Sequence, residues 1–137
     1  MANYKSAISK VLLTEGGYVN DPDDNGGETY RGIARKFWAN WSGWVIIDIC
    51  KKDPKNFPKN LNTNPTLNEL IIGFYKINFW DKVGGDAIKD QNIAYVLVDT
   101  AVLEGIKPAV KREQGICGMA QNGIIDQYLV GKLNSMA

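Results

Sequence analysis

Residues 15–34 read EGGYVNDPDDNGGETYRGIA, and this stretch decides the fold. Two short pieces with β-forming residues, YVN at 18–20 and ETYRGI at 28–33, flank the run DPDDNGG. Pro, Asn and Gly between two such pieces are the residues from which tight turns are built. Residues 15–30 contain no Lys or Arg, and they gather the carboxylates of Glu15, Asp21, Asp23, Asp24 and Glu28. We therefore predict an irregular, acidic β-hairpin.

An amphipathic helix is predicted directly before the hairpin, over residues 3–14. Its apolar residues recur at helical spacing, which places them on one face: Ala7, Ile8, Val11 and Leu12. Gly16 and Gly17 then end the helix. Glu15 is thereby expected at the helix C-terminus, where the negative pole of the helix dipole disfavours an ionised carboxylate.

The segments after the hairpin predict further helices. Residues 34–52 are aromatic and apolar and indicate one helix and a connection, whereas 53–66 is rich in Pro, Asn and Lys and is typical of a surface loop. Thr66 with Glu69 three residues later forms a capping box, which predicts a helix that extends toward Trp80.

A central helix is predicted at QNIAYVLVDTAVLEG, residues 91–105, because its apolar face is broad enough to be mostly buried. Gly105 and Pro108 break this helix, and two short helices around a glycine-rich turn are expected after it. The chain shows no internal repeat and no linker. We predict a mainly α (α+β) fold, a helical domain with a small β-hairpin after the first helix.

The composition excludes several classes of function. The chain has 16 Lys and Arg against 15 Asp and Glu, so its net charge of +1 gives no electrostatic reason to bind nucleic acid. It contains no His, and Cys50 and Cys117 lie far apart, so no zinc set and no Ser/His or Cys/His catalytic pair can form. We expect two buried or half-buried thiols, no metal and no cofactor.

The expected location follows from the hydropathy pattern. The N-terminus lacks the apolar region of a signal peptide, and no stretch approaches the roughly 18 apolar residues of a membrane span. We expect a monomer that is made in the cytoplasm and that reaches the cell wall or periplasm by export or lysis.

Carboxylates are therefore the groups available for catalysis. Glycoside hydrolysis needs a proton donor for the leaving oxygen and usually a second carboxylate. The helix end and nearby apolar residues should raise the pKa of Glu15 and keep it protonated near neutral pH. Asp24 is a candidate for the second carboxylate, or alternatively a residue that holds the turn. Thr29 could position water or simply fit a strand.

The string EGGYVNDPDDNGGETYRGIA resembles the signature of glycoside hydrolase family 108, whose members are lysozyme-like N-acetylmuramidases of phages and bacteria. This resemblance implies a lysozyme-like fold and a catalytic role for Glu15. The order of Glu15, Asp24 and Thr29 also resembles the catalytic set of phage-type lysozymes, although the gap from Asp to Thr is one residue shorter here.

The resemblance continues in FYKINFWDKVGGDAI at 74–88 and in IAYVLVDTAVLEG at 93–105. Residues 115–134, GICGMAQNGIIDQYLVGKLN, are similar to the start of the family's peptidoglycan-binding region. We accordingly expect a lysozyme-like catalytic region at 1–90 and a helical region at 91–137 packed in the same domain. The chain departs from the family pattern at four positions: Ala34, Leu103, Asp126 and Gln127.

The sequence thus predicts a hydrolase that acts on peptidoglycan glycan strands. The bond expected is the β-1,4 linkage between N-acetylmuramic acid and N-acetylglucosamine. Tyr18, Asp21 and Tyr30 are candidate substrate-binding residues, although the two tyrosines could instead pack the hairpin. Two other functions stay open, a lytic transglycosylase and a catalytically weak protein that binds peptidoglycan or assists secretion.

Overall fold

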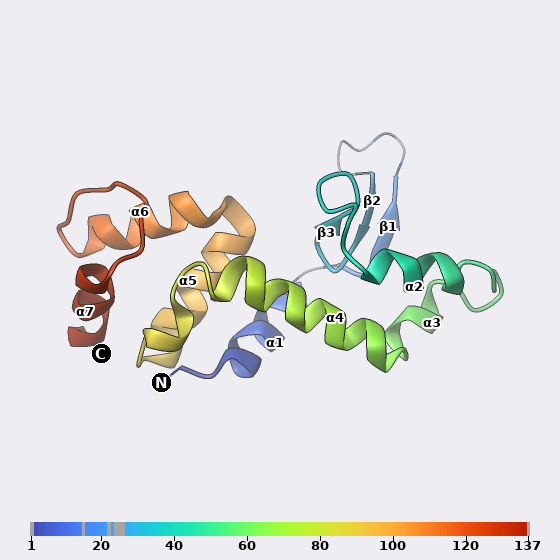
Figure 1. Ribbon diagram of the computed structural model, residues 1–137, viewed down its shortest axis with the longest axis horizontal. Coiled ribbons are helices and arrows are strands. Elements are labelled where there is room, and N and C mark those ends of the chain that lie inside the picture. Colours follow the sequence, from blue (N-terminus) through green and yellow to red (C-terminus); the bar gives the residue numbers. More distant parts are fainter. Residues whose placement is uncertain (1, 15, 22, 24–26, 137) are drawn as a thin grey trace. The chain divides into compact units, whose positions relative to one another are not determined.

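The computed structural model describes residues 2–14, 16–21, 23 and 27–136 (Figure 1). The chain forms two compact units. The first, Leu12–Phe74, is called the hairpin unit; the second joins Met1–Val11 to Tyr75–Ala137 and is called the terminal unit. The described residues form seven α-helices and one three-stranded antiparallel sheet, which confirms the predicted mainly α (α+β) fold.

The first helix, α1 (Tyr4–Thr14), has nearly the predicted bounds. Ala7, Ile8 and Val11 are at most 2% exposed, whereas Lys5 and Lys10 are exposed, as expected for an amphipathic helix. The chain passes from the terminal unit to the hairpin unit within α1, after Val11.

The predicted hairpin is present as β1 (Tyr18–Asn20) and β2 (Glu28–Tyr30), which pair antiparallel with Asn20 opposite Glu28. A third strand, β3 (Ile33–Ala34), pairs with β2. The sequence predicted one returning piece over 28–33. The chain instead reverses again at Arg31 and Gly32, whose φ angles of 50° and 81° form a two-residue turn.

Two helices of the hairpin unit follow the sheet along the chain (Figure 1). They are α2 (Gly43–Cys50) and the short α3 (Lys59–Asn62). The predicted loop 53–66 thus contains one helical turn. The first residue of α2 is glycine because the Trp41 ring lies against it: a Cβ at Gly43 would lie 2.3 Å from that ring. The core of this unit consists of apolar side chains at most 7% exposed: Tyr30, Ile33, Trp44, Ile47, Leu61, Leu67, Ile71 and Phe74.

Helix α4 (Pro65–Tyr75) begins one residue before the predicted N-cap, so the predicted capping box at Thr66 and Glu69 is wrong. The cap is Asn64, whose Oδ1 accepts a hydrogen bond from the backbone N of Leu67 at 2.9 Å. Pro65 suits the first helical position because it lacks an N–H and its φ is already helical. The helical backbone continues to Trp80 as predicted, through the π-helix η1 (Lys76–Trp80).

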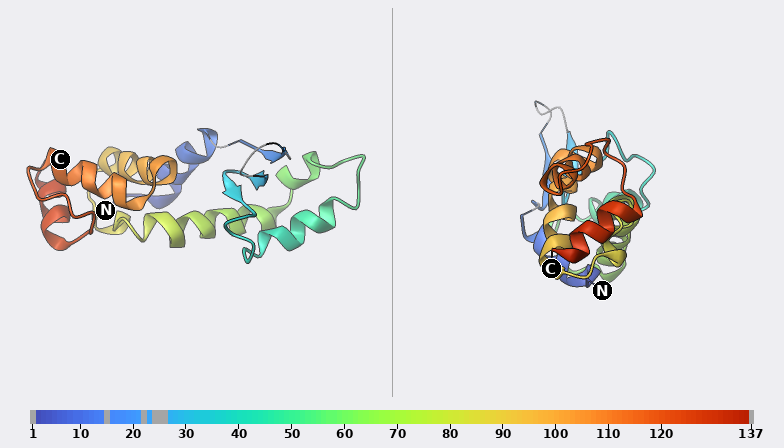
Figure 2. Two further views of the ribbon diagram at one scale, coloured as in Figure 1. Left: turned by 90° about the horizontal axis from the view of Figure 1, so that it is seen from above. Right: turned by 90° about the vertical axis from the view of Figure 1, so that its left-hand side faces the viewer.

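The terminal unit is built around α5 (Gln91–Glu104), which confirms the predicted central helix. Its buried face is at most 1% exposed and consists of Ala94, Leu97, Val98 and Ala101. Asp90 caps its start, and Gly105, with φ of 105°, ends it. Helix α6 (Ile106–Ile116) packs along α5 (Figure 2), and Pro108 is accommodated in its first turn.

Three further elements complete the terminal unit. The 3-10 helix η2 (Gly85–Ala87) follows Trp80, whose side chain is fully buried in the core. Helix α7 (Gln127–Ser135) is capped by Asp126. The N-terminal segment is fixed to the start of α5, because Asn3 N donates to Gln91 Oε1 at 2.5 Å and Gln91 Nε2 donates to Asn3 O at 2.9 Å.

The cap of α4 leads to a direct test. We expect Asn64→Ala to lower the free energy of unfolding by about 1 kcal/mol, because the backbone N–H of Leu67 loses its acceptor. Thr66→Ala should change that energy by less than about 0.5 kcal/mol, since Thr66 is an exposed residue already inside the helix. Urea unfolding of both variants measures the difference, and a larger loss in Thr66→Ala would contradict this assignment.

Candidate active site

The two leading catalytic candidates, Glu15 and Asp24, lie outside the described residues, and their roles stay predictions. Their neighbours in the chain are placed. Helix α1 ends at Thr14, directly before Glu15 in the sequence. Asp21 directly follows β1 and is exposed, and its Oδ1 accepts a hydrogen bond from the backbone N of Asp23 at 2.9 Å. Asp21 thus forms an Asx-type turn at the start of residues 21–27, the acidic loop between β1 and β2.

The other predicted site residues lie on the two strands of the hairpin. Tyr18 is half-buried, and its ring meets Phe57 edge-on with centroids 4.8 Å apart. Thr29 is half-buried in the middle of β2, opposite Val19. Tyr30 is 1% exposed. The Tyr30 ring therefore packs in the core, and stacking on a sugar would require that ring to become exposed.

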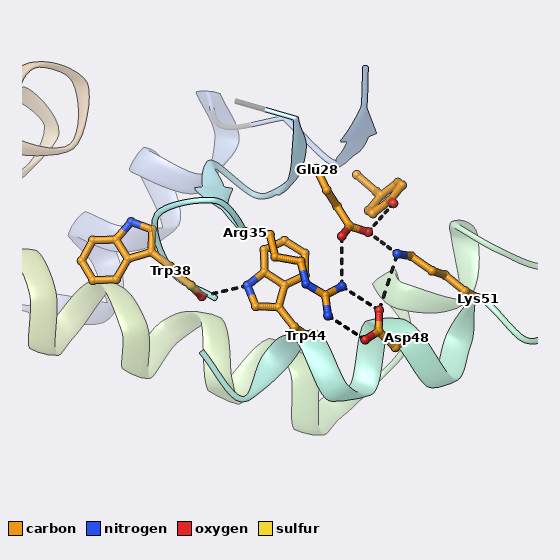
Figure 3. A network of polar contacts seen from close by, with 7 residues as sticks. Glu28, Arg35, Trp38, Trp44, Asp48 and Lys51 are labelled. Carbon is orange, nitrogen blue, oxygen red and sulfur yellow. Dashed lines mark hydrogen bonds and ion pairs between the residues drawn. The ribbon is translucent and has the colours of Figure 1, made fainter. Parts of the chain in front are cut away.

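A network of charged side chains surrounds Glu28, a residue for which the sequence predicted no role (Figure 3). Its carboxylate accepts hydrogen bonds from Tyr18 Oη at 2.5 Å, from Arg35 Nη1 at 3.0 Å and from Lys51 Nζ. Arg35 also binds both oxygens of Asp48, at 2.7 and 2.8 Å, and Lys51 Nζ lies 3.5 Å from Asp48. The network joins β1, β2 and the residue after β3 to α2.

The local structure explains why these side chains meet. The backbone N of Arg35 donates to Glu28 O at 2.9 Å, which continues the pairing of β3 with β2. Trp44, Asp48 and Lys51 follow one another at helical spacings of four and three, so they share one side of α2 and its C-terminal end. The guanidinium of Arg35 lies 5.2 Å from the centroid of the Trp44 ring (Figure 3), a cation–π distance.

The network determines the protonation of its members. Burial would raise the pKa of Glu28, but hydrogen bonds from Lys51, Tyr18 and Arg35 outweigh it and hold that pKa below its ordinary value. Burial and the adjacent Glu28 carboxylate raise the pKa of Tyr18. Burial would lower the pKa of Lys51, yet its hydrogen bond to Glu28 raises it. Glu28 is therefore ionised near neutral pH and does not act as a proton donor.

A pocket of about 240 Å³ lies in the hairpin unit. It is lined by residues from α1, the turn after β2, α3 and α4: Leu12, Arg31, Asn62, Asn68, Ile71 and Ile72. Pockets for drug-sized ligands have volumes of about 300–1,000 Å³, so this one suits a single sugar ring or its substituent. Leu12 is three positions before Glu15 in the chain, and Tyr30 Oη donates to Asn62 Oδ1 at 3.5 Å. None of these six residues was predicted from the sequence to belong to a site.

Among residues 2–14, 16–21, 23 and 27–136, no three His, Cys, Asp or Glu side chains lie close enough together to hold a metal ion. Cys50 and Cys117 are free and half-buried, as predicted. None of the helices in these ranges has the length and apolar character needed to span a membrane.

The ion pair of Asp48 predicts how stability depends on acid. Its hydrogen bonds from Arg35 lower its pKa to about 2 in the folded protein, against roughly 3.9 for an unperturbed Asp. The unfolded chain therefore takes up the proton first as the pH falls, and the free energy of unfolding declines between about pH 4 and pH 2. Asp48→Asn should make this decline shallower, most clearly at low ionic strength. Urea unfolding across that pH range measures it, and an unchanged slope would show that the pair contributes nothing.

The comparisons with known proteins agree with the residue-level resemblance. The model of the family described as Glycosyl hydrolase 108 matches residues 8–105. The solved structure of SagA from Brucella abortus is 28% identical, with a TM-score of 0.66, and the match covers 98% of this chain and 70% of that chain. None of the curated proteins matches the chain. Because the family match spans more than half of the sequence and includes α1 from Ile8 onward and both strands of the hairpin, the chain belongs to glycosyl hydrolase family 108.

Proposed function

We propose that this protein hydrolyses the β-1,4 bond between N-acetylmuramic acid and N-acetylglucosamine in peptidoglycan. The observation that carries the proposal is the family match over residues 8–105, which includes the motif in which Glu15 stands. Family membership supports the cleavage of a glycosidic bond. The choice of peptidoglycan rests on the resemblance of residues 15–34 to the muramidase motif.

In this proposal Glu15 protonates the leaving glycosidic oxygen. A second carboxylate, Asp24, assists the attacking water, and Thr29 positions that water. The reaction needs no metal ion. The ionised state of Glu28 supports the assignment, because it removes the other glutamate of the motif as a candidate acid. The Glu28 network instead fixes the strands on either side of the acidic loop.

The glycan strand is the proposed partner. The pocket lined by Leu12, Asn62 and Asn68 offers aliphatic surface and side-chain amides, which suit the ring face and the acetamido group of an amino sugar. Tyr18 at the start of β1 and Asp21 directly after β1 are proposed to contact neighbouring sugars. A substrate role for Tyr30 depends on exposure of a ring that is 1% exposed here.

Residues 91–137 are proposed to add affinity for the wall. The segment similar to the start of a peptidoglycan-binding region carries large apolar side chains that are more than half exposed: Ile116 at 57%, Ile124 at 62% and Tyr128 at 72%. Exposed apolar and aromatic side chains of this kind are typical of binding surfaces.

The first test is loss of turbidity of purified peptidoglycan. Glu15→Gln keeps the shape of the side chain but cannot donate the proton, so we expect the rate to fall by a factor of about 100 or more. Glu104→Gln is the matched control, because it makes the same change at an exposed residue of the terminal unit and should keep the wild-type rate. Wild-type protein that clears no wall, or Glu15→Gln that clears it at full rate while folded, would overturn the proposal.

The second test is mass spectrometry of the released fragments. Hydrolysis adds water across the bond, so the muramic acid end should carry a free reducing hydroxyl. A lytic transglycosylase would instead release an anhydro end, lighter by one water molecule. Anhydro products from the wild type would reassign the reaction while leaving Glu15 as the acid.

A further inference from the structure

Two neighbouring aromatic side chains of the hairpin unit, Phe37 and Trp38, are exposed in the turn that follows β3. Phe37 is 70% exposed and Trp38 is 38% exposed. Their backbone N–H groups both donate to Ala34 O, at 3.1 and 2.9 Å, so the turn is fixed to the last residue of β3. The Trp38 ring points away from the Glu28 network (Figure 3). We call Phe37 and Trp38 the aromatic pair.

Trp38 is held in place by several contacts. Its ring meets the Phe74 ring of α4 edge-on, with centroids 4.8 Å apart and an angle of 87° between the planes. Its backbone oxygen accepts hydrogen bonds from Trp41 N and from Trp44 Nε1, each at 3.0 Å. A ring that is fixed before binding loses little conformational freedom when a ligand covers it.

Packing of the core does not account for the exposure of the aromatic pair. Single exposed apolar residues are common in folded proteins and need no explanation. Phe37 and Trp38 are instead adjacent, and more than a third of the Trp38 surface stays in contact with water although its position is fixed. A binding surface explains both properties, because such a surface must be accessible and rigid before the ligand arrives.

The aromatic pair lies next to the pocket of the hairpin unit along α4. Ile71 lines that pocket, and Phe74, against which Trp38 packs, follows Ile71 by three positions on the same side of the helix. Trp41 fixes the same segment to α4, because its Nε1 donates to Leu70 O at 3.4 Å. A linear polymer with one unit in the pocket therefore has Trp38 within reach of a neighbouring unit.

The ring of an amino sugar suits an aromatic surface. The face of an aromatic ring carries partial negative charge. In β-linked N-acetylglucosamine and N-acetylmuramic acid the ring substituents are equatorial, so the two faces of the sugar ring present C–H groups with partial positive charge. A sugar ring and an indole ring consequently attract each other face to face, and water leaves both apolar surfaces.

We propose that Trp38, together with Phe37, forms a stacking site for a sugar ring of the glycan strand, next to the sugar in the pocket lined by Asn68 and Ile71. The inference rests on the proposed function for the identity of the substrate. It goes further in assigning a second sugar position outside the pocket and in naming the aromatic side chains that create it.

The experiment measures binding and does not depend on turnover. The protein carries Glu15→Gln, so that bound glycan is not cleaved, and the probe is soluble glycan strands freed of peptide. Leucine keeps an apolar side chain but removes the aromatic face. We expect calorimetry to show that Trp38→Leu raises the Kd by about tenfold and Phe37→Leu by about threefold. Trp38→Phe, which keeps an aromatic face, should bind with a Kd close to that of the parent.

Tryptophan fluorescence gives a readout that a merely structural role of Trp38 would not change. Binding of the strands should shift the emission of the parent protein to shorter wavelength, because an indole ring leaves water. Trp38→Phe should bind the strands but lack most of this shift, since Trp44 and Trp80 are already buried. A full shift in Trp38→Phe would show that the strand covers another tryptophan and would overturn the proposal.

Two controls separate stacking from folding and from general loss of apolar surface. Phe37→Leu should melt at the temperature of the parent, because Phe37 is 70% exposed. Val45→Ala with Ile49→Ala removes apolar surface from two α2 residues that are 63% and 59% exposed, and should leave the Kd unchanged. An equal loss of affinity in this control contradicts the assignment.

The remaining outcomes are also decisive. Parent-like Kd values in both leucine variants overturn the proposal while leaving the hydrolase proposal untouched. If those variants instead change self-association in sedimentation velocity at an unchanged glycan Kd, the aromatic pair belongs to a contact between copies of the chain, and the stacking site is rejected. If the leucine variants bind glycan more weakly but wild-type protein clears no wall, the stacking site stands and the hydrolase proposal fails.

Discussion

The hairpin unit depends on the Glu28 carboxylate and its three donors. The Glu28 side chain is 12% exposed, and a carboxylate so far from water is stable as an ion only when its oxygens are paired. The donors come from β1, from the residue after β3 and from the end of α2, so satisfying one charge also fixes the relative position of these elements. The network thereby links the two strands that residues 21–27 connect.

Much of the fold could be predicted from the sequence, because the signals for it are local. The spacing of Ala7, Ile8 and Val11 predicts α1, and the turn residues at 21–27 predict the hairpin. The cap of α4 was misassigned, because Asn64 and Thr66 are both good caps and Pro65 decides between them. The third strand was missed, because an arginine in a left-handed conformation departs from the usual turn chemistry.

The candidate site was less predictable. Glu15 could be identified because a contiguous motif contains it. The pocket could not, since Leu12, Asn68 and Ile72 are separated along the chain and residues of these types form no catalytic motif. Asp48 and Lys51 carried a weak signal, an opposite-charge pair three residues apart, but nothing local connects them with Glu28. The packing of Tyr30 likewise depends on tertiary contacts and not on its place in the strand.

The two units also differ in the length of chain between the residues that their hydrogen bonds join. Within the Glu28 network the hydrogen-bonded residues are 7 to 23 positions apart, so short loops bring them together. In the terminal unit Asn3 bonds to Gln91, 88 positions later. Closing a longer loop costs more entropy and slows folding. During synthesis the residues that bond to one another in the hairpin unit therefore emerge soon after each other. The N-terminal segment can bond to Gln91 only after most of the chain has been made.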